Sequence, residues 1–452
     1  MPYLAGGAMT TEIDTPIEDK IVEVLRQLGI ERAHFASRGL NDWHGLAVGY
    51  PQAIASLTLV CPLGFDSQTL APLADRLLVF NADSGGASET ISRNMATLES
   101  ASLVTLTGCA YPDNYNDLAV QRSSDVGPAM LRFLADMDAR NGPEAVPPSI
   151  AEGEIDGIYF KINGAGNPLV LLPLGAALSQ WDPLIPALSE RYCVISMTGP
   201  ALGMVASLES RGHTPGYLSA VRSLLTEAEI QPGEEVLEVG CGTGVLCRWL
   251  ARETDLKNPI VGMDVNTFFL REAAEIARRE GLEDMVSFRE GSAEALPFDD
   301  NSMDVTFSST VVQRVNADLM LPEMVRVTIP GGRVAVLGHA HDMNRWVNLP
   351  LSPALKAKIE SPPWVEDRGH PMGCDDASLY QRFSRLGLAN VRMFPFISTF
   401  SDRMRLQFLQ GGILPTLSAE EAMEWRAAVE RAEANGTFFI STPFHCAVGT
   451  KT

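Results

Sequence analysis

The residues best suited to chemistry lie in one glycine-rich stretch in the second half of the chain. Residues 235–246 read E-V-L-E-V-G-C-G-T-G-V-L. The apolar start predicts a short buried strand, and the glycines then let the backbone turn sharply into a helix. Because glycine has no side chain, a ligand can approach the backbone there, and the first amides of the helix face it. We therefore expect this turn to bind a nucleotide-like ligand.

An acidic side chain just before the turn narrows the class of ligand. The glycine spacing is G-x-G-x-G, which differs from the G-x-G-x-x-G spacing of dinucleotide-binding turns. The carboxylate of Glu238, two residues before the first glycine, would repel a pyrophosphate. It would attract a ligand that bears an ammonium and a sulfonium, so the stretch favours a cationic ligand.

This stretch and the segments after it resemble the class I S-adenosylmethionine (SAM) dependent methyltransferases. The segments that follow in the family's order are a strand at 259–263 ending in Asp264, a strand at 286–289 followed by G-S-A-E-A-L-P-F, a strand within D-D-N-S-M-D-V-T-F-S-S (299–309), and E-M-V-R-V-T-I-P-G-G-R-V-A-V-L-G (323–338). The last one resembles the helix, Pro-Gly-Gly turn and fifth strand of the ubiquinone/menaquinone-type and small-molecule enzymes. The resemblance covers about residues 213–452. It implies a Rossmann-like sheet, SAM as cofactor and S-adenosylhomocysteine (SAH) as product.

The resemblance also implies a role for each residue that matches a family motif. Glu238 would hold the methionine ammonium, and Asp264 would accept both ribose hydroxyls, which suits a carboxylate. Ser308 would face the methionine part with its backbone. The other matched positions would wrap the methionyl and ribose groups through their backbone (Gly240, Cys241, Gly242 and Gly244) or flank the adenine (Met263 and Val265).

Two of the matched positions, Ser292 and Cys241, need a comment on their residue type. Ser292 and Ala293 match the pair that reads the adenine edge, but the family usually has an aspartate at the first of them, and serine weakens that contact. We interpret Cys241 as a small turn residue rather than a reactive thiol.

A general base is needed only if the methyl acceptor must lose a proton, because methyl transfer from a sulfonium is an in-line displacement. The candidates are His339 and His341 in L-G-H-A-H-D, with Asp342 as the residue that orients them. These histidines could equally be polar loop residues or a weak metal site. His445 is a less favoured base. The aromatic residues of the same region could line an acceptor site or, as we favour, pack in the core: Trp346, Trp364, Phe394, Phe396, Phe400 and Phe444.

The first third of the chain alternates helix and strand, which predicts an α/β domain with a parallel sheet. Helices are expected at 17–28, 40–50 and 125–140, and strands at 32–36, 54–62, 76–80 and 102–106. The elements at 15–140 resemble the second half of an α/β-hydrolase, and those at 150–210 resemble its first half. The halves therefore stand in reversed order. Either one chain assembles a permuted sheet, or the halves pair between subunits of a homo-oligomer.

The catalytic residues of a hydrolase are missing from this predicted domain. Gly39 stands where the nucleophilic serine of a G-x-S-x-G turn belongs, and Ser37 is off register. A turn predicted at 107–112 offers Tyr111 in place of the histidine, so Asp83 would lack catalytic partners. In the other half, Pro173 and Leu174 replace the His-Gly of the oxyanion hole. We therefore expect a non-catalytic scaffold.

Composition limits the partners and the compartment. The formal net charge of -21 argues against nucleic acid, which requires a basic surface. Neither a membrane span nor a secretion signal is evident, so we expect a cytoplasmic location. Seven cysteines without C-x-x-C spacing argue against a disulfide framework or a metal site, and we expect packed, reduced thiols.

The predicted organisation is therefore two-part. Residues 1–212 form the hydrolase-like domain, and residues 213–452 form the methyltransferase domain, with substrate-pocket elements at 339–452. A helix at 216–229 would cover the cofactor; Tyr217 and Arg222 on it could reach the methionine end, although we favour solvated positions. The predicted activity is methyl transfer from SAM to an O, N, S or C atom of a small molecule. The alternatives are a bifunctional protein with residual hydrolase or esterase activity and a non-catalytic SAM-binding sensor or scaffold.

Overall fold

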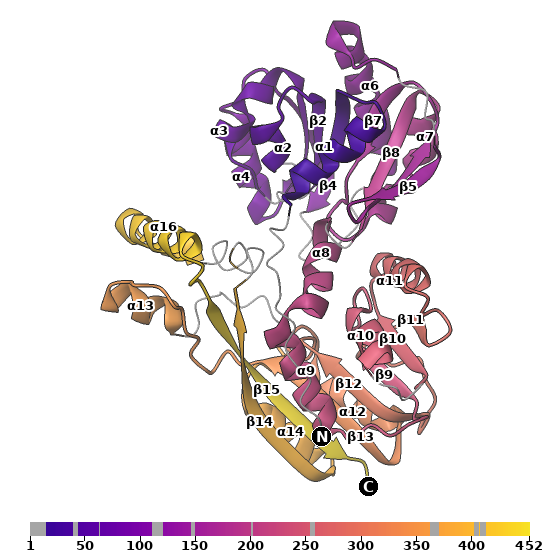
Figure 1. The fold of residues 1–452 in the computed structure, drawn as a ribbon, viewed down its shortest axis with the longest axis vertical. Helices are drawn as coiled ribbons and strands as arrows, with labels where there is room; N and C mark the ends of the chain where they lie inside the picture. The colour runs from indigo at the N-terminus through magenta and orange to yellow at the C-terminus, as the bar shows by residue number, and fades with distance from the viewer. Residues whose placement is uncertain are drawn as a thin grey trace. The chain divides into compact units, whose positions relative to one another are not determined.

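The computed structural model describes residues 15–38, 44–62, 64–110, 121–145, 150–199, 202–253, 258–361, 370–401, 406 and 413–452. The chain divides into two compact units, Met1–Ala206 and Ser207–Thr452 (Figure 1). Residues 207–212, which the sequence assigned to the first domain, belong to the second unit. Within the ranges given above, none of the helices is both long enough and apolar enough to cross a bilayer.

The first unit is built on one eight-stranded sheet in the order β4-β3-β2-β1-β7-β8-β6-β5. The strands are β1 (Ala33–Ser37), β2 (Ile54–Val60), β3 (Leu77–Ser84), β4 (Ser102–Ala110), β5 (Glu152–Ile155), β6 (Ile158–Asn163), β7 (Asn167–Leu171) and β8 (Tyr192–Thr198). All pairs are parallel except β5 with β6 and β6 with β8. Every residue of β1 and β2 is buried, as expected for parallel strands covered on both faces.

Helices and turns of this unit follow the predicted alternation. They are α1 (Ile17–Gln27), α2 (His44–Gly49), α3 (Ser67–Leu70), α4 (Gly86–Met95), α6 (Ser123–Asn141) and α7 (Ile185–Ser189), with 3-10 helices at Ala71–Arg76 and Leu178–Trp181. Helix α8 (Gly203–Glu209) begins in this unit and ends in the second. The predicted helices and strands are therefore confirmed in type and order. Because β1 pairs with β7, the two halves of the sheet meet within one chain.

One predicted turn in this unit is wrong. The segment 107–110, expected to turn, continues as strand β4, which pairs with β3 as far as Ser84 and Ala110. The carboxylate of Asp83 holds this end of the strand, because it accepts hydrogen bonds from the amides of Gly108 at 2.5 Å and Cys109 at 3.1 Å. Gly39, Tyr111 and Trp364 lie outside the described residues.

The second unit has a seven-stranded sheet in the order β11-β10-β9-β12-β13-β15-β14. Its strands are β9 (Val236–Val239), β10 (Ile260–Asp264), β11 (Val286–Glu290), β12 (Met303–Ser309), β13 (Thr328–His339), β14 (Ala389–Phe400) and β15 (Ile440–Thr450). Its helices are α9 (Pro215–Glu227), α10 (Val245–Glu253), α11 (Thr267–Arg279), α12 (Ala317–Val327), α13 (Pro353–Glu360), α14 (Ser378–Arg385) and α16 (Ala419–Ala434), with 3-10 helices at Ser210–His213 and Leu414–Thr416. The strands from β11 to β13 are parallel, and β15 is antiparallel to both of its neighbours.

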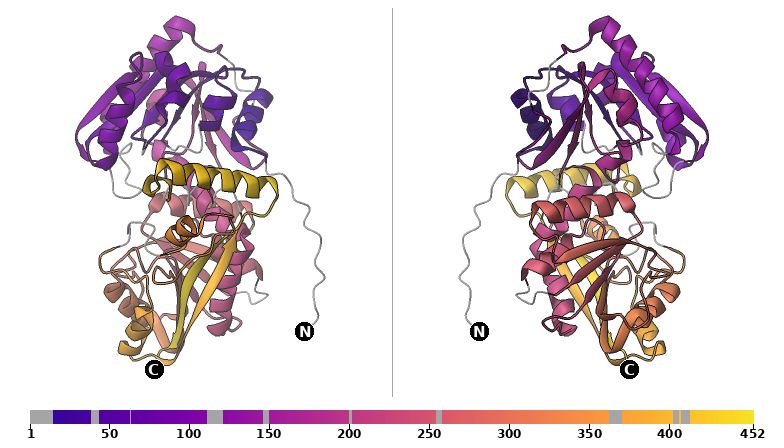
Figure 2. Two further views of the ribbon diagram at one scale, coloured as in Figure 1. Left: turned by 90° about the vertical axis from the view of Figure 1, so that its left-hand side faces the viewer. Right: turned by 90° about the vertical axis from the view of Figure 1, so that its right-hand side faces the viewer.

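Helices cover both faces of this sheet. Leu224 of α9 and Leu250 of α10 pack in the core of one face, while Met320 of α12 and Phe383 of α14 pack in the core of the other. Figure 2 shows α9 and α14 on opposite sides of β14 and β15. Successive residues of β15 therefore point into different cores.

The Pro-Gly-Gly segment does not form the predicted separate turn. It lies inside β13, where the pairing with β12 jumps from Met303 and Thr328 to Val305 and Arg333. Gly331 there has a φ of +81°, so the segment forms a bulge that the glycine permits. The strand then continues to His339 and carries the following loop to the carboxyl edge of the sheet.

Candidate active site

The glycine turn lies at the carboxyl end of β9, between β10 and β12. Gly240, Gly242 and Gly244 have φ values of +78°, +55° and +69°. A Cβ atom on Gly244 would lie 2.3 Å from the ring of Phe288, and one on Gly240 would lie 2.4 Å from Val311. Conformation and space therefore both require glycine in this turn.

Glu238 is buried at the root of the turn. It is 2% exposed, and the thiol of Cys247 donates a hydrogen bond to its Oε2 at 2.8 Å. Burial raises the pKa of Glu238 to about 8, and the nearby charge of Asp264 adds to this effect, whereas the Cys247 hydrogen bond opposes it. A cation that enters the turn would favour the ionised carboxylate.

Asp264 ends the neighbouring strand and faces the same turn. Its Oδ2 accepts the amide of Gly242 and its Oδ1 accepts the amide of Asn266, each at 2.8 Å. Burial raises the pKa of this carboxyl, and the two backbone hydrogen bonds oppose the shift. Each carboxylate oxygen can accept a second hydrogen bond, so ribose hydroxyls can still be accommodated.

The predicted adenine-flanking residues lie on either side of Asp264. Met263 is 1% exposed, and its carbonyl accepts the amides of Gly240 at 2.7 Å and Cys241 at 2.9 Å. Val265 is 72% exposed, which leaves an apolar surface beside the Asp264 carboxylate. Met263 therefore supports the turn through its backbone, and Val265 is open to a ligand.

Side chains of α12 hold the loop that carries Ser292 and Ala293 in place. Ser292 is exposed and accepts a hydrogen bond from the amide of Glu294 at 3.2 Å, while Ala293 is buried. Glu323 accepts the amide of Leu296 at 2.8 Å, and Arg326 donates to the carbonyl of Leu296 at 2.9 Å.

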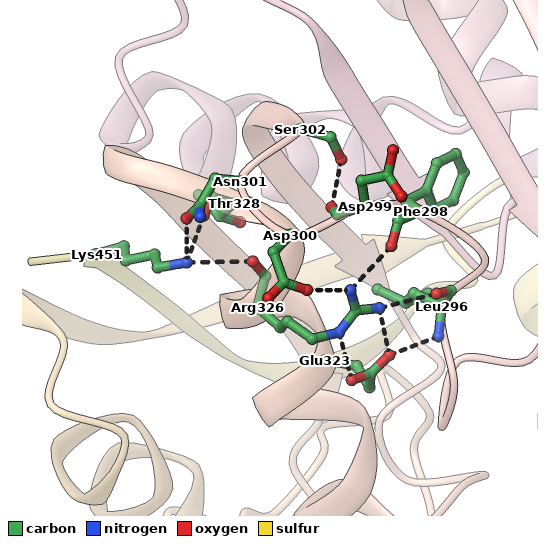
Figure 3. Close-up of polar contacts among 10 residues, drawn as sticks. All are labelled: Leu296, Phe298, Asp299, Asp300, Asn301, Ser302, Glu323, Arg326, Thr328 and Lys451. Atoms are coloured by element: carbon green, nitrogen blue, oxygen red, sulfur yellow. Dashed lines mark hydrogen bonds and ion pairs between the residues drawn. The ribbon is translucent and has the colours of Figure 1, made fainter.

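Arg326 is the centre of the network that anchors this loop, as Figure 3 shows. Besides Glu323 and the carbonyl of Leu296, its guanidinium contacts Asp300 at 2.7 Å and the carbonyl of Phe298 at 2.9 Å. One arginine of α12 therefore holds several points of the segment between β11 and β12.

The end of β12 closes the turn on its other side. The hydroxyl of Ser308, which is fully buried, donates to the carbonyl of Val239 at 2.8 Å. Ser309 shares a 2.7 Å hydrogen bond with the hydroxyl of Tyr217, which is 1% exposed. Tyr217 is thus buried at the site rather than solvated.

Arg222, the other residue of α9 that was considered, lies away from this group. It forms an ion pair with Glu253 at 2.8 Å and lies over the ring of Trp249. Its predicted solvated position is confirmed, because its side chain is 55% exposed.

Two residues of the segment before α9 were missed by sequence reasoning. Arg211 donates to the hydroxyl of Thr310 at 2.9 Å and lies 5.6 Å from the centre of the Tyr217 ring. Glu209, which is 3% exposed, accepts hydrogen bonds from the hydroxyl of Thr243 in the glycine turn and from Arg248. Neither residue lies in a recognisable motif, so only the folded chain brings them to the turn.

The histidines after β13 form an aromatic cluster. The rings of His339 and His341 are stacked with centroids 5.9 Å apart, and His339 lies 5.0 Å from Phe444. The centroid of the Phe444 ring in turn lies 6.1 Å from that of the Tyr217 ring. The cluster therefore connects the end of β13 to the residue that bonds Ser309.

The predicted orienting role of Asp342 toward these histidines is wrong. Nδ1 of His341 lies 2.8 Å from Oδ2 of Asp375, whereas Asp342 lies 2.6 Å from Nε2 of His445. Asp342 also accepts the amide of Ala377 at 3.1 Å. Because the loop after β13 turns back on itself, the sequence neighbour of His341 faces a different partner.

His445 points away from the aromatic cluster. Phe444 belongs to the core that contains Tyr217, whereas Ala447, on the same face of β15 as His445, belongs to the core beneath α14. The His445–Asp342 hydrogen bond therefore holds the loop after β13 in place. The His341–Asp375 pair lies with the aromatic cluster that contains Phe444. Of the predicted aromatic residues, Phe400 is buried and Trp346 is 55% exposed; Phe394 and Phe396 are partly buried against the core.

Comparisons with known proteins identify this unit. A family model described as "Methyltransferase domain" matches residues 237–336. The ubiquinone/menaquinone biosynthesis C-methyltransferase UbiE of Cupriavidus necator is 30% identical over 183 residues, which are 38% of this chain and 73% of that protein. Methyltransferase GfsG of Streptomyces halstedii is 38% identical over 114 residues, 25% of this chain and 40% of GfsG. The crystal structure of YcgJ from Bacillus subtilis covers 52% of this chain and 98% of its own, with 18% identity and a TM-score of 0.36.

The matched segment contains the glycine turn, both carboxyl groups and the strands on either side of them. The match to UbiE extends well beyond this segment and covers most of that enzyme. The chain therefore belongs to the family of class I SAM-dependent methyltransferases.

Proposed function

We propose that the second unit moves the methyl group of SAM to an oxygen, nitrogen, sulfur or carbon atom of a small molecule. The observation that carries this proposal is the meeting of the glycine turn with two carboxyl groups, that of Glu238, which is buried, and that of Asp264, which is partly buried. The small acceptor is supported by the relative named for ubiquinone and menaquinone biosynthesis.

Each group around the turn has a proposed role in holding the cofactor. Glu238 holds the methionine ammonium, Asp264 accepts the ribose hydroxyls, and the backbone of residues 240–244 and of Ser308 wraps the methionyl part. The positive charge of Arg211, close enough to Glu238 to oppose its raised pKa, meets the methionine carboxylate. Met263, Val265, Ser292 and Ala293 flank the adenine.

For an acceptor that must lose a proton, we propose His341 as the general base. If Nδ1 of His341 donates to Asp375, the ring is fixed and Nε2 is left to take the proton. His339 stacks on this ring and holds its plane. His341 is 41% exposed, so an acceptor can reach it.

The cofactor site is tested by thermal unfolding with SAH. At one hundred times its dissociation constant, SAH should stabilise the wild type by roughly 2.7 kcal/mol, a shift of a few degrees in Tm. Asp264→Ala should lose the shift. A shift that survives in Asp264→Ala would contradict the assigned ribose contact, and binding without turnover on any acceptor would favour a sensor or scaffold.

The base is tested with labelled SAM and an acceptor found by screening. His341→Gln should lower kcat by about 100-fold or more without changing the Kd for SAH. His445→Gln serves as the matched control, because it removes a histidine from the other face of the sheet. Equal effects of the two substitutions would argue against His341 as the base.

For the first unit we propose a rearranged, non-catalytic α/β-hydrolase-like domain. The pairing of β1 with β7 supports it, because this pair joins the two predicted halves in one sheet. Gln180 supports the loss of activity. Its buried side-chain oxygen accepts the amides of Ala176 at 2.9 Å and Ala177 at 3.1 Å, in the loop where a hydrolase forms its oxyanion hole.

Ser37 is a poor nucleophile in this setting, because it is fully buried at the end of β1. Fluorogenic esters should therefore not be turned over by the full-length protein. Turnover that disappears in Ser37→Ala would support the bifunctional alternative instead.

A further inference from the structure

Two cysteine side chains converge beside the glycine turn. Cys241 lies between the first two glycines, and Cys247 lies in the first turns of α10. Both sulfur atoms approach the same point on β10: a Cβ atom on Gly262 would lie 2.9 Å from Sγ of Cys241 and 3.0 Å from Sγ of Cys247. The thiol of Cys241 donates to the carbonyl of Gly242 at 3.7 Å. The missing side chain of Gly262 thus leaves space that the pair of thiols fills.

A carboxyl group completes this arrangement. The thiol of Cys247 donates to Oε2 of Glu238 at 2.8 Å, so Glu238 can accept the proton of that thiol. Cys241 is 5% exposed and Cys247 is fully buried. All seven cysteines are buried. The thiol of Cys446 offers a comparison with this pair, because burial alone raises its pKa, to about 12.

We propose that Cys241 and Cys247 are a redox modification site, at which a peroxide forms a reversible disulfide that closes the cofactor turn. The regulatory part rests on the proposed function, because it assumes that residues 240–244 and Glu238 hold SAM. The formation of the disulfide itself does not depend on that assumption. Cys241, interpreted from the sequence as a small turn residue, thereby gains a chemical role.

The reaction consumes one peroxide and both thiols. The Cys241 sulfur attacks one peroxide oxygen, the O–O bond breaks, and a sulfenic acid and one water are produced. In the fraction of molecules with an ionised Glu238, which grows as the pH approaches 8, Cys247 passes its proton to that carboxylate; the Cys247 sulfur then attacks the sulfenic sulfur, forming the S–S bond and expelling hydroxide. The hydroxide takes up the proton and leaves as a second water. The two thiols lose two electrons, which the peroxide gains.

The disulfide would disturb the site in two ways. The thiol that donates to Glu238 disappears, and the backbone at Cys241 is tied to α10 at the point where it must adapt to a ligand. Conversely, a bound cofactor covers the turn and should protect it. Since burial raises the pKa of both thiols, we expect oxidation to be slow compared with that of an exposed cysteine.

The sequence makes the modification easy to detect in the full-length protein. Trypsin cleaves after Arg222 and Arg248, and the peptide from Ser223 to Arg248 contains Cys241 and Cys247 as its only cysteines and no internal lysine or arginine. After hydrogen peroxide treatment and alkylation of free thiols, this peptide should be lighter than its reduced form by two hydrogen atoms and should carry no alkyl groups. SAH should slow the change several-fold, and dithiothreitol should reverse it.

The functional effect is measured as the shift in Tm that SAH produces, before and after peroxide. The oxidised wild type should lose the shift and regain it with dithiothreitol, and Cys446→Ser should behave in the same way. The Cys247→Ser variant cannot form the disulfide, but its hydroxyl can still donate to Glu238. The Tm shift that SAH produces in this variant should therefore be the same before and after peroxide treatment.

Each failure has a separate meaning. If both cysteines of this peptide are still alkylated after peroxide treatment, in the wild type and in Cys446→Ser, no disulfide has formed and the proposed modification site is overturned. A disulfide that leaves the SAH shift intact would overturn the switch. If reduced wild-type protein shows no SAH shift while the disulfide still forms, the proposed cofactor roles fail and the modification site stands.

Discussion

Binding of SAH at pH 6.5 should release nearly one proton from Glu238 for each molecule bound. The carboxyl group is 2% exposed, and burial, strengthened by the charge of Asp264, raises its pKa to about 8. About 97% of the ligand-free protein then carries this proton at pH 6.5. In the proposed complex the ligand's ammonium stabilises the ionised form, so the proton must leave.

The size of the effect on affinity follows from the same pKa. Each pH unit below 8 costs about 1.4 kcal/mol of binding free energy, because the carboxyl group must be deprotonated before it pairs with the ammonium. The Kd for SAH should therefore fall about tenfold between pH 6 and pH 7. Above about pH 8 the free protein already carries the ionised carboxylate, so the Kd should then change little with pH as long as the ligand keeps its ammonium.

Isothermal titration calorimetry in buffers of different ionisation enthalpy measures the number of protons released. Glu238→Gln keeps an acceptor for the Cys247 thiol but has no proton to lose, so its Kd should be flat between pH 6 and 7. Asp264→Asn, the matched control, should bind more weakly and still release the proton. The reasoning is refuted if wild-type protein releases no proton at pH 6.5, or if Glu238→Gln releases as much as the wild type.

The same proton affects folding stability. A raised pKa in the folded state means that the folded protein holds the proton while the unfolded chain releases it near pH 4.5. Stability relative to Glu238→Gln should therefore fall as the pH rises from about 4.5 to about 8. Chemical unfolding at several pH values would show no such slope if the folded protein already carries an ionised carboxylate over this range.

Three further predictions concern stability and can be checked by urea or thermal unfolding. Gly244→Ala should cost more than Gly281→Ala, although both residues have similar positive φ values, +69° and +68°. In the described part of the chain nothing lies within 4 Å of a Cβ at 281, so backbone strain alone should cost about 1–2 kcal/mol there. At 244 the clash with Phe288 adds to the strain and should also abolish the Tm shift produced by SAH. Equal losses of stability in the two variants would contradict this. Arg326→Ala should destabilise the second unit by about 2 kcal/mol and weaken SAH binding, because it releases the loop that carries Ser292 and Ala293. Arg278→Ala, which removes an exposed pair, should stay within about 0.5 kcal/mol. Burial lowers the pKa of His34. The first unit should therefore lose stability as the pH falls below about 6.5, where only the unfolded chain takes up the proton readily. His34→Gln should remove that part of the pH dependence, and an unchanged slope of stability against pH would show that other groups cause it.

The parts of the site that the sequence predicted are those fixed by local backbone requirements. The glycine spacing alone specifies a turn, and all three glycines have the positive φ that only glycine adopts easily. Asp264 was predicted from its resemblance to a family motif, and the parallel pairing of β9 with β10 indeed places the end of its strand beside the turn. The roles of these residues toward SAM remain predictions.

The parts that could not be predicted depend on contacts between distant segments. Arg211 meets Thr310 across 99 residues, and His341 meets Asp375 across 34 residues of irregular chain. Proximity in sequence favoured Asp342 as the partner of His341, but the turn after β13 directs that carboxylate to His445. Periodicity carries no information about such pairs, because neither partner lies in a regular element whose face is known in advance.

The pairing of β1 with β7 has a consequence for synthesis on the ribosome. All five residues of β1 are buried in the finished sheet, yet β7 emerges only after more than one hundred further residues have been translated. At 5–20 residues per second, one edge of β1 stays without its partner for roughly ten seconds. A nascent apolar edge of this kind can pair with another chain, so chaperone demand and expression temperature should affect the yield of this protein more than its final stability suggests.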